Sequence, residues 1–412
     1  MRSSQAAPQD TRLGDTRRKT KKRGRCASSL VSCVLCLVSC VLCLVSCVLS
    51  CNPACPHRVS TVCWRGEIFM ANLSESMAWL ARRDGSVVIG HGPFEAAAAM
   101  PAAGTAFYVR DFALREARPW KIPAAVEVID SGEFATRHVA VAAAPCQWQA
   151  LDAAPFAAVF QEVMAAIHAG LFEKTVPVVT ETGCCNHAPG PAIIAAMARQ
   201  SAPLYSFGWS QGDSGFAGAT PELLISLDGL RLETMALAGT ARRDDCDVFA
   251  VDSKEIREHE YVAQALVAKL TDLGHLQRCP REILDLGSIV HFLTSLRLDL
   301  HQPQSPEALV QRLHPTPALG PLPRTADTLA LLLEWRDRLG CPDTFGAPFG
   351  VWHAGRFDAV VAIRGLWWNN CQLTLPAGCG IIEASRLVNE WRELRLKREA
   401  VKAGACMPMG SV

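Results

Sequence analysis

The sequence lacks three patterns that would each have pointed to a class of protein. No G-x-G-x-x-G loop and no phosphate-loop lysine motif follows a strand-like run, which argues against the common nucleotide-binding folds. No Cys/His cluster has the spacing of a zinc site. From Met70 onwards, 30 Lys/Arg stand against 37 Asp/Glu, so this part has no basic footprint and we expect no nucleic-acid partner.

Residues 1–69 have a different composition from the rest of the chain. They hold 11 Lys/Arg against 3 Asp/Glu, and the seven-residue sequence at 31–37 recurs identically at 38–44. A basic stretch before an apolar run is compatible with a membrane anchor or a cleaved signal. An identical cysteine-rich repeat instead favours translated repetitive DNA ahead of a start at Met70. We therefore expect residues 1–69 to be a low-complexity, Cys-rich leader outside the fold.

The remaining chain is long enough and apolar enough for a large core in one or two domains. Half of the 412 residues are hydrophobic. Nine of the 18 cysteines follow Met70 and form no regular framework, which indicates reduced thiols in a cytoplasmic protein. We expect residues 70–150 to form the N-terminal part of the fold and residues 151–412 to form its catalytic region.

Short strand-like runs alternate irregularly with helical patterns along this part of the chain. Strands are expected at 86–89, 106–109, 126–129, 174–179, 205–209, 215–219, 223–227, 289–298, 358–364 and 372–375. Helices are expected at 156–170, from 252 onwards, at 326–338 and at 388–402, with a proline-rich loop at 314–323. Strand pairs interrupted by helices, without regular β-α-β alternation, predict an α+β fold with mostly antiparallel sheets.

Two predicted helices each carry a pair of glutamates three residues apart. Glu255 and Glu258 form one pair, and Glu390 and Glu393 form the other, with Lys397 one turn further on. Residues three, four and seven apart share one face of a helix. Two such faces could supply carboxylates to Mg²⁺, which binds one or two carboxylates, water and an anionic substrate. The alternative for the second helix is an ordinary surface ion pair between Glu393 and Lys397.

Six sequence blocks, taken in order, resemble the chorismate-utilising enzymes. This family includes isochorismate synthases, salicylate synthases, anthranilate synthase large subunits and aminodeoxychorismate synthases. The blocks are residues 218–222 (GATPE), 237–240 (LAGT), 254–259 (KEIREH), 314–320 (HPTPALG), 362–364 (AIR) and 377–397. The resemblance covers about residues 155–402. It implies mostly antiparallel sheets packed together with helices on the outside, an active site in a central cleft, and chorismate as substrate.

Within the family, three positions favour isochorismate synthase. Lys174 stands where water-using members carry a base, whereas anthranilate synthases usually have a glutamine there. Ala238 replaces the lysine that aminodeoxychorismate synthases use as a nucleophile. Phe345 stands where salicylate synthases tend to have tyrosine. The resemblance therefore implies an isomerase that needs no glutaminase subunit and acts as a monomer. Salicylate synthase, or a chorismate-binding paralogue without this activity, is the alternative.

The reaction implied by the resemblance needs a general base and a general acid. Water must attack C2 of chorismate while the hydroxyl on C4 leaves with a proton. The resemblance makes Lys174 the base and Glu222 the acid. A lysine acts as a base only where its neutral amine is favoured, and the valines after Lys174 predict a buried strand. Without the resemblance, Lys174 would be a solvated lysine at a strand start and Glu222 an acid in a first helical turn.

The resemblance also assigns the groups that hold the substrate and the metal. Mg²⁺ would be bound by Glu258 and Glu393, with Glu255 and Glu390 binding it directly or through water. The enolpyruvyl carboxylate would meet Arg364, which can form a bidentate pair. The expected substrate-binding residues are Gly239, Thr240, His291, Ala318, Leu319, Phe345, Arg364, Gly378, Gly380 and Lys397. For His291, the alternative is a hydrogen-bonded core histidine.

Two features depart from the family pattern. The family often has an arginine shortly after the base, but here Val178-Val179-Thr180-Glu181 follows. Gly320-Pro321 replaces the usual glycine- or serine-rich end of the loop. The resemblance leaves open whether isochorismate would feed menaquinone or a siderophore such as a salicylate or catechol.

A chain that starts at Met70 tests the expectation for residues 1–69. Because the charge and the repeat both change before Met70, we expect the shortened protein to be soluble and to unfold in one cooperative transition. Circular dichroism during thermal unfolding measures this. Loss of folding on truncation, or recovery of the intact chain in membranes with residues 31–51 present, would contradict the expectation.

Overall fold

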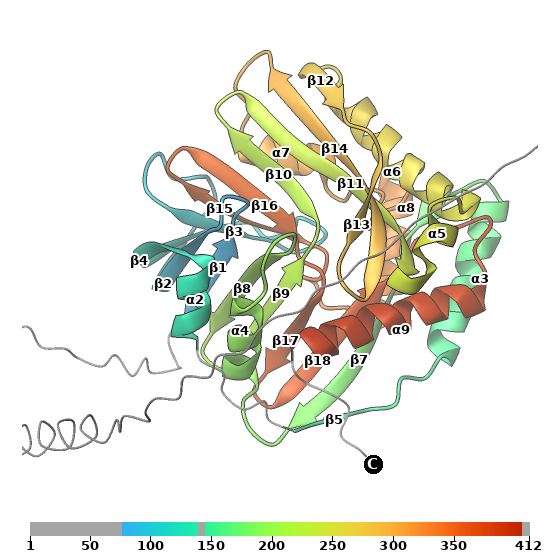
Figure 1. Cartoon of the computed structure of the whole chain (residues 1–412), viewed down its shortest axis with the longest axis horizontal. Coiled ribbons are helices and arrows are strands. Elements are labelled where there is room, and N and C mark those ends of the chain that lie inside the picture. Colours follow the sequence, from blue (N-terminus) through green and yellow to red (C-terminus); the bar gives the residue numbers. More distant parts are fainter. Residues whose placement is uncertain (1–75, 139–144, 406–412) are drawn as a thin grey trace, which may run out of the picture. The chain divides into compact units, whose positions relative to one another are not determined.

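A computed structural model describes residues 76–138 and 145–405. The chain divides into two units, Met1–Phe69 and Met70–Val412. The expectation that residues 1–69 form a Cys-rich leader outside the fold concerns residues that lie outside the described ones. Figure 1 shows the second unit as a long series of strands with helices beside them. Within the described residues, none of the helices combines the length and the apolar composition that crossing a membrane requires.

The strands and helices follow one another irregularly. The strands of the first half are β1 (Met77–Ala81), β2 (Ser86–Ala97), β3 (Ala106–Val109), β4 (Trp120–Asp130), β5 (Cys146–Trp148), β6 (Lys174–Thr175), β7 (Val178–Cys185), β8 (Tyr205–Gln211) and β9 (Ser214–Thr220). Those of the second half are β10 (Leu223–Asp228), β11 (Arg231–Arg242), β12 (Gly274–Arg278), β13 (Glu282–Asp285), β14 (Ile289–Leu300), β15 (Pro348–His353), β16 (Arg356–Val361), β17 (Gly365–Asn369), β18 (Gln372–Gly378) and β19 (Ile381–Ile382). The helices are α2 (Ser131–Arg137), α3 (Ala154–His168), α4 (Gly190–Ala198), α5 (Cys246–Phe249), α6 (Ser253–Leu270), α7 (Pro306–Leu313), α8 (Ala326–Arg338) and α9 (Leu387–Gly404), with a 3-10 turn at Arg243–Asp245.

The strands pair antiparallel in one continuous ladder. It runs from β5 through β7, β18, β17, β9, β8, β1, β2, β4, β3, β15, β16, β10 and β11 to β14, which also pairs with β12 and β13. β6 and β19 form a separate two-stranded sheet. The ladder joins strands from both sides of residue 150, because β1 pairs with β8 and β3 pairs with β15.

The two faces of the ladder have different neighbours. In β1, Ala78 and Leu80 belong to a core made almost wholly of strand residues, whereas Trp79 belongs to a core that also contains residues of α2 and α4. Successive strand residues point to opposite faces, so one face packs on other strands and the other is covered by helices. This arrangement confirms the expected α+β fold of packed antiparallel sheets with helices outside.

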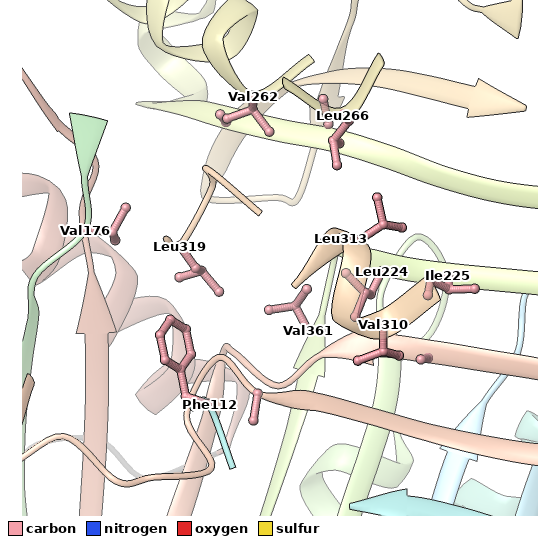
Figure 2. Packing of buried hydrophobic residues seen from close by; sticks show 14 of the residues in the cluster. Phe112, Val176, Leu224, Ile225, Val262, Leu266, Val310, Leu313, Leu319 and Val361 are labelled. Carbon is pink, nitrogen blue, oxygen red and sulfur yellow. The ribbon is translucent and has the colours of Figure 1, made fainter. Parts of the chain in front are cut away.

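The largest core cluster joins α3, α6, α7 and α8 to the second-half strands. Val262 and Leu266 of α6, with Val310 and Leu313 of α7, are buried in it, and Figure 2 shows Val310 and Leu313 beside Leu224 of β10. The same cluster contains a residue of the proline-rich loop, Leu319, and residues near the predicted base, such as Val176. The core therefore holds the loop and the strand of the predicted site in place.

The helices α6 and α8 each begin at a residue whose side chain caps the helix. Asp252 caps α6 by accepting hydrogen bonds from the amides of Lys254 and Glu255. Thr325 and Thr328 form a reciprocal capping pair at the start of α8, whose predicted bounds of 326–338 are confirmed.

The sequence prediction was wrong in several places. The strand expected to end on Arg364 ends at Val361, and Arg364 lies in a turn with φ of +58°. The expected small-residue turn at 377–382 instead begins with the last two residues of β18 and ends with β19. The elements α2, α4, α5, α7, β1, β5, β11, β12, β13, β15, β17 and β19 were not predicted. In β17, the sequence Gly-Leu-Trp-Trp gave no alternating pattern, because both faces of this strand are buried.

Candidate active site

One cleft is lined by side chains from strands near both ends of the ladder. It lies between β11, β18, the proline-rich loop and α9, and all predicted site residues line it except Lys174, Glu255 and Glu390. Lys174 and Glu390 are buried and Glu255 is half-buried, and these three contact Glu258, Lys254 and the amide of Thr240, respectively. The arrangement places the predicted residues around one space.

Lys174 and Glu258 form an ion pair at the base of this cleft. Lys174 is fully buried on β6, and its Nζ lies 3.1 Å from Oε1 of Glu258 on α6. Burial raises the pKa of Glu258, but the charges of Lys174 and Lys254 outweigh that effect and lower it to about 2. Glu258 is therefore ionised across the physiological range, and it links β6 to α6.

Lys254 draws the other carboxylates together. Its Nζ lies 2.9 Å from Oε1 of Glu255, 3.5 Å from Oε2 of Glu258 and 3.3 Å from Oε1 of Glu390 on α9. Burial favours the neutral amine, but the surrounding glutamates outweigh it and raise the pKa of Lys254. The ammonium is therefore the charge that holds the acidic faces of α6 and α9 against each other.

Two of these glutamates have raised pKa values. Burial and the charge of Glu258 raise the pKa of Glu255 to about 7, and burial and the charge of Glu393 raise that of Glu390 to about 8. Neither oxygen of Glu390 has a hydrogen-bond partner among the described residues, although both are buried. Four glutamates therefore surround three lysines, Lys174, Lys254 and Lys397, and the raised pKa values of Glu255 and Glu390 relieve the repulsion by favouring their protonated forms.

Glu222 lies in the cleft apart from the other carboxylates. Its carboxyl is 3% exposed, follows β9, and accepts a hydrogen bond of 3.4 Å from the hydroxyl of Thr316. Burial raises its pKa to about 7, while Thr316 and the charge of Lys174 act in the opposite direction. Near neutrality this carboxyl is poised between its acid and base forms.

Arg364 is held by His291 at the opposite wall. Nη2 of Arg364 donates to Nε2 of His291 at 2.8 Å, and Nδ1 of His291 donates to the carbonyl of Gly239 at 2.7 Å. Burial and the charge of Arg364 lower the pKa of His291 well below its usual value, so the ring is neutral and can accept from the guanidinium. His291 was expected to be either a substrate-binding residue or a hydrogen-bonded core histidine. It has features of both, because it lines the cleft and its two ring nitrogens have hydrogen-bond partners.

Lys397 is fixed to the floor of the cleft by two contacts. Its Nζ lies 2.6 Å from Oε1 of Glu393 and donates to the carbonyl of Gly378 at 2.9 Å. The side chains of Lys397 and Glu393 are 16% and 13% exposed, so this is a mostly buried pair rather than an ordinary surface one. The backbone carbonyl of Gly378 therefore binds the ammonium of Lys397.

Gly380 leaves room for the ion pair of Lys174. A Cβ at position 380 would lie 2.0 Å from Oε1 of Glu258 and 2.6 Å from Cε of Lys174. Any side chain there would displace one of the two charged groups. At Gly239 the reason for glycine is different, because its φ is +76°.

Sequence reasoning missed two polar residues of the site. Lys254 and Thr316 lie inside two of the blocks that resemble the family, but no role was predicted for either. The spacing of Lys254 and Glu258, four apart on a helix, was a usable signal. Nothing in the sequence indicated that Thr316 would reach Glu222, because the two are 94 residues apart.

Replacing Gly380 by alanine tests the packing around the ion pair. Because the added methyl group must push apart Lys174 and Glu258, we expect a loss of about 1–3 kcal/mol in the free energy of unfolding, measured in urea. Gly404→Ala is the matched control, since a Cβ there meets only Gln200 at 3.9 Å. Equal stability of the two variants would contradict the interpretation.

Comparisons with known proteins agree with the geometry. The family described as "Chorismate binding enzyme" matches residues 123–404. Isochorismate synthase EntC of Escherichia coli (strain K12) is 32% identical over 219 residues, which cover 50% of this chain and 55% of the relative. A salicylate biosynthesis isochorismate synthase of Pseudomonas aeruginosa is 30% identical over 253 residues, which cover 58% and 52%. The chain spans about half the length of the curated relatives it matches.

The fold has counterparts among solved structures. MenF, the menaquinone-specific isochorismate synthase from Escherichia coli, superposes with a TM-score of 0.68 at 18% identity, covering 90% of this chain and 99% of that one. The family match takes in β4 to α9, and with them every residue of the cleft described above. This chain belongs to the chorismate-binding enzyme family.

Proposed function

We propose that the protein is a cytoplasmic isochorismate synthase that converts chorismate to isochorismate with Mg²⁺, by adding water at C2 with loss of the C4 hydroxyl. The observation that carries the proposal is the placement of a buried lysine and a buried acid at one cleft that also contains cationic groups for an anionic substrate. Glu222, Arg364 and Lys397 line the cleft, and Lys174 lies behind Glu258. The names of the relatives support the choice of reaction.

The acid of the reaction would be Glu222. Its pKa of about 7 leaves a large fraction protonated near neutrality, so its carboxyl can give a proton to the departing C4 hydroxyl. Thr316 fixes one of its oxygens, which orients the other toward the cleft. No carboxylate pairs with Glu222 among the described residues, and this separation from the acidic cluster lets it serve as a proton donor.

The base of the reaction would be Lys174. A lysine amine that is buried and held by one carboxylate has a fixed direction, which a general base needs. Its neutral amine, which forms once the ion pair with Glu258 is released, would take a proton from the water that adds to C2. Because Lys174 and Glu222 come from different strands, β6 and the end of β9, they can act on opposite sides of the substrate ring.

The two carboxylates of the substrate need cationic partners. Arg364 offers a guanidinium whose position is set by His291, and such a group can bind the enolpyruvyl carboxylate in bidentate fashion. The ring carboxylate would lie toward Glu258 and Glu393, where Mg²⁺ would offset their negative charge.

The residues present fit a magnesium ion by their chemistry. Glu255, Glu258, Glu390 and Glu393 supply carboxylate oxygens, which Mg²⁺ prefers, and Glu390 has two buried oxygens without hydrogen-bond partners among the described residues. No three His, Cys, Asp or Glu side chains within residues 76–138 and 145–405 are arranged so that they could already hold an ion. The carboxylates of Glu255, Glu258 and Glu390 contact Lys254, so metal binding would require its ammonium to move aside. When bound, the ion would supply positive charge for a substrate carboxylate.

Chorismate incubated with purified protein and Mg²⁺ tests the proposal. We expect reversible formation of isochorismate without ammonia, detected by chromatography, and loss of turnover in excess chelator. Lys174→Ala should lower kcat at least ~10²-fold while chorismate still binds, because the base is removed. Circular dichroism must show that this variant is folded, because the change also leaves the buried carboxylate of Glu258 without its partner. Lys121→Ala, on β4 away from the cleft, is the control.

The reaction products distinguish the proposed function from its alternatives. Full turnover in excess chelator would refute the requirement for Mg²⁺. Salicylate with pyruvate as the main product would move the assignment to salicylate synthase. Anthranilate formed from ammonia would refute the role given to Lys174, and binding without turnover would indicate a paralogue that only binds chorismate.

The pH dependence of kcat tests the role of Glu222. Its pKa is raised to about 7, so the acid form is present below that pH and is lost above it. We therefore expect kcat to fall about tenfold per pH unit above about pH 7. Glu222→Gln should lose at least ~10²-fold at every pH, because its amide cannot deliver the proton. Glu334→Gln, whose side chain is 62% exposed, should match the wild type. An active Glu222→Gln enzyme would refute the assignment.

A further inference from the structure

Three charged side chains are buried between β7 and α9, outside the cleft. Glu181 of β7 accepts hydrogen bonds from Nε of Arg398 at 3.0 Å and from Nζ of Lys402 at 2.5 Å. The three residues are 6–7% exposed, and none lines the cleft. Two tryptophans extend the cluster, because Arg398 lies over Trp391 at 5.6 Å and Lys402 lies over Trp148 at 4.1 Å.

Burying three charges is unfavourable for stability compared with an apolar contact of the same size. A buried ion cluster does, however, define one arrangement of the groups that carry it, because its hydrogen bonds are directional. An apolar helix face can slide or rotate on a sheet by small amounts at little cost. The cluster of Glu181, Arg398 and Lys402, here called the β7–α9 clamp, removes that freedom.

The clamp lies next to the part of α9 that enters the site. Arg398 directly follows Lys397, which bonds to the carbonyl of Gly378 on β18. β18 pairs with β7, with Gly378 opposite Val178 and Leu375 opposite Glu181. One turn of α9 is therefore bonded to two adjacent strands, on two sides of the helix, since consecutive residues lie about 100° apart around its axis.

The helix so fixed carries the acidic residues of the proposed metal site. Glu393 and Glu390 precede Arg398 by about one and two turns on α9. A rotation of α9 would move both carboxylates away from Glu258 and Lys254, which belong to another helix.

We propose that Glu181, Arg398 and Lys402 are positioning residues that set the rotation and height of α9, and thereby the placement of Glu390 and Glu393 for Mg²⁺ and substrate. This inference rests on the proposed function only where it predicts the Mg²⁺ dependence of isochorismate formation. Its structural part, the fixing of α9 by the clamp, stands on the hydrogen bonds alone.

The test compares Arg398→Met with Arg395→Met in the full-length protein. Arg398→Met leaves Glu181 paired with Lys402, so the chain should still fold. Arg395 lies on the same helix, is 56% exposed and pairs only with Glu399 among the described residues, which makes it the matched control. Hydrogen–deuterium exchange of residues 387–404 and the half-saturating Mg²⁺ concentration for isochorismate formation are measured in both, at a temperature where both are folded.

We expect selective loosening of α9 in Arg398→Met. Its amides should exchange at least ~10-fold faster than in the control, while α6 and α8 exchange as before. The half-saturating Mg²⁺ concentration should rise ~10–100-fold, the range found when groups that orient metal ligands are removed. Arg398→Lys should recover most of both losses, because Glu181 receives a single bond from Nε, which a lysine can replace. Lys402→Met should act in the same direction as Arg398→Met.

Two outcomes would overturn the inference. A lower melting temperature with unchanged Mg²⁺ dependence and with exchange raised equally in all helices would show that the clamp only stabilises the fold. Exchange of α9 equal to that in Arg395→Met would show that the clamp does not fix the helix. If the wild type forms no isochorismate, the proposed function fails, and the exchange measurement alone decides the inference.

Discussion

The ion pair between Lys174 and Glu258 is the contact on which the rest of the site depends. It joins β6 to α6 in a place where both side chains are almost fully buried, so each charge needs the other. Gly380 has no side chain because any Cβ would collide with both partners. Glu258 also contacts Lys254, which extends the charge network to α9. Breaking this one pair would therefore disturb the strand, both helices and the adjoining turn.

The fold separates two kinds of acid that the proposed chemistry uses differently. The glutamates of α6 and α9 face one another across Lys254, where mutual repulsion and nearby ammonium groups set their charge. Glu222 lies at the end of β9, beneath the proline-rich loop, where burial dominates. The contrast is sharpest between Glu258, whose pKa is lowered to about 2, and Glu222, whose pKa is raised to about 7. A site that must both bind a cation and donate a proton needs two such environments.

Sequence reasoning reached the site residues more reliably than the elements that carry them. The paired glutamates were found because helical spacing is local, and the bounds of α8 were found because a helix is recognised from neighbouring residues. Arg364 was placed at the end of a strand, yet it lies in a turn of positive φ where its guanidinium meets His291, 73 residues away. The strand β11 was missed, although its LAGT motif was recognised, because both of its faces are largely buried and show no alternation.

The acidic pairs, the order of the family blocks and the mixed α+β composition could be predicted from the chain, since these depend on spacing and residue type. Three contacts follow only from the way the chain folds: Lys174 meets Glu258, Lys254 lies among three glutamates, and Glu181 binds Arg398 and Lys402. These contacts join residues up to 221 positions apart. Their existence depends on how the antiparallel ladder brings β7 and β18 beneath α9, and no local pattern in the chain encodes that pairing.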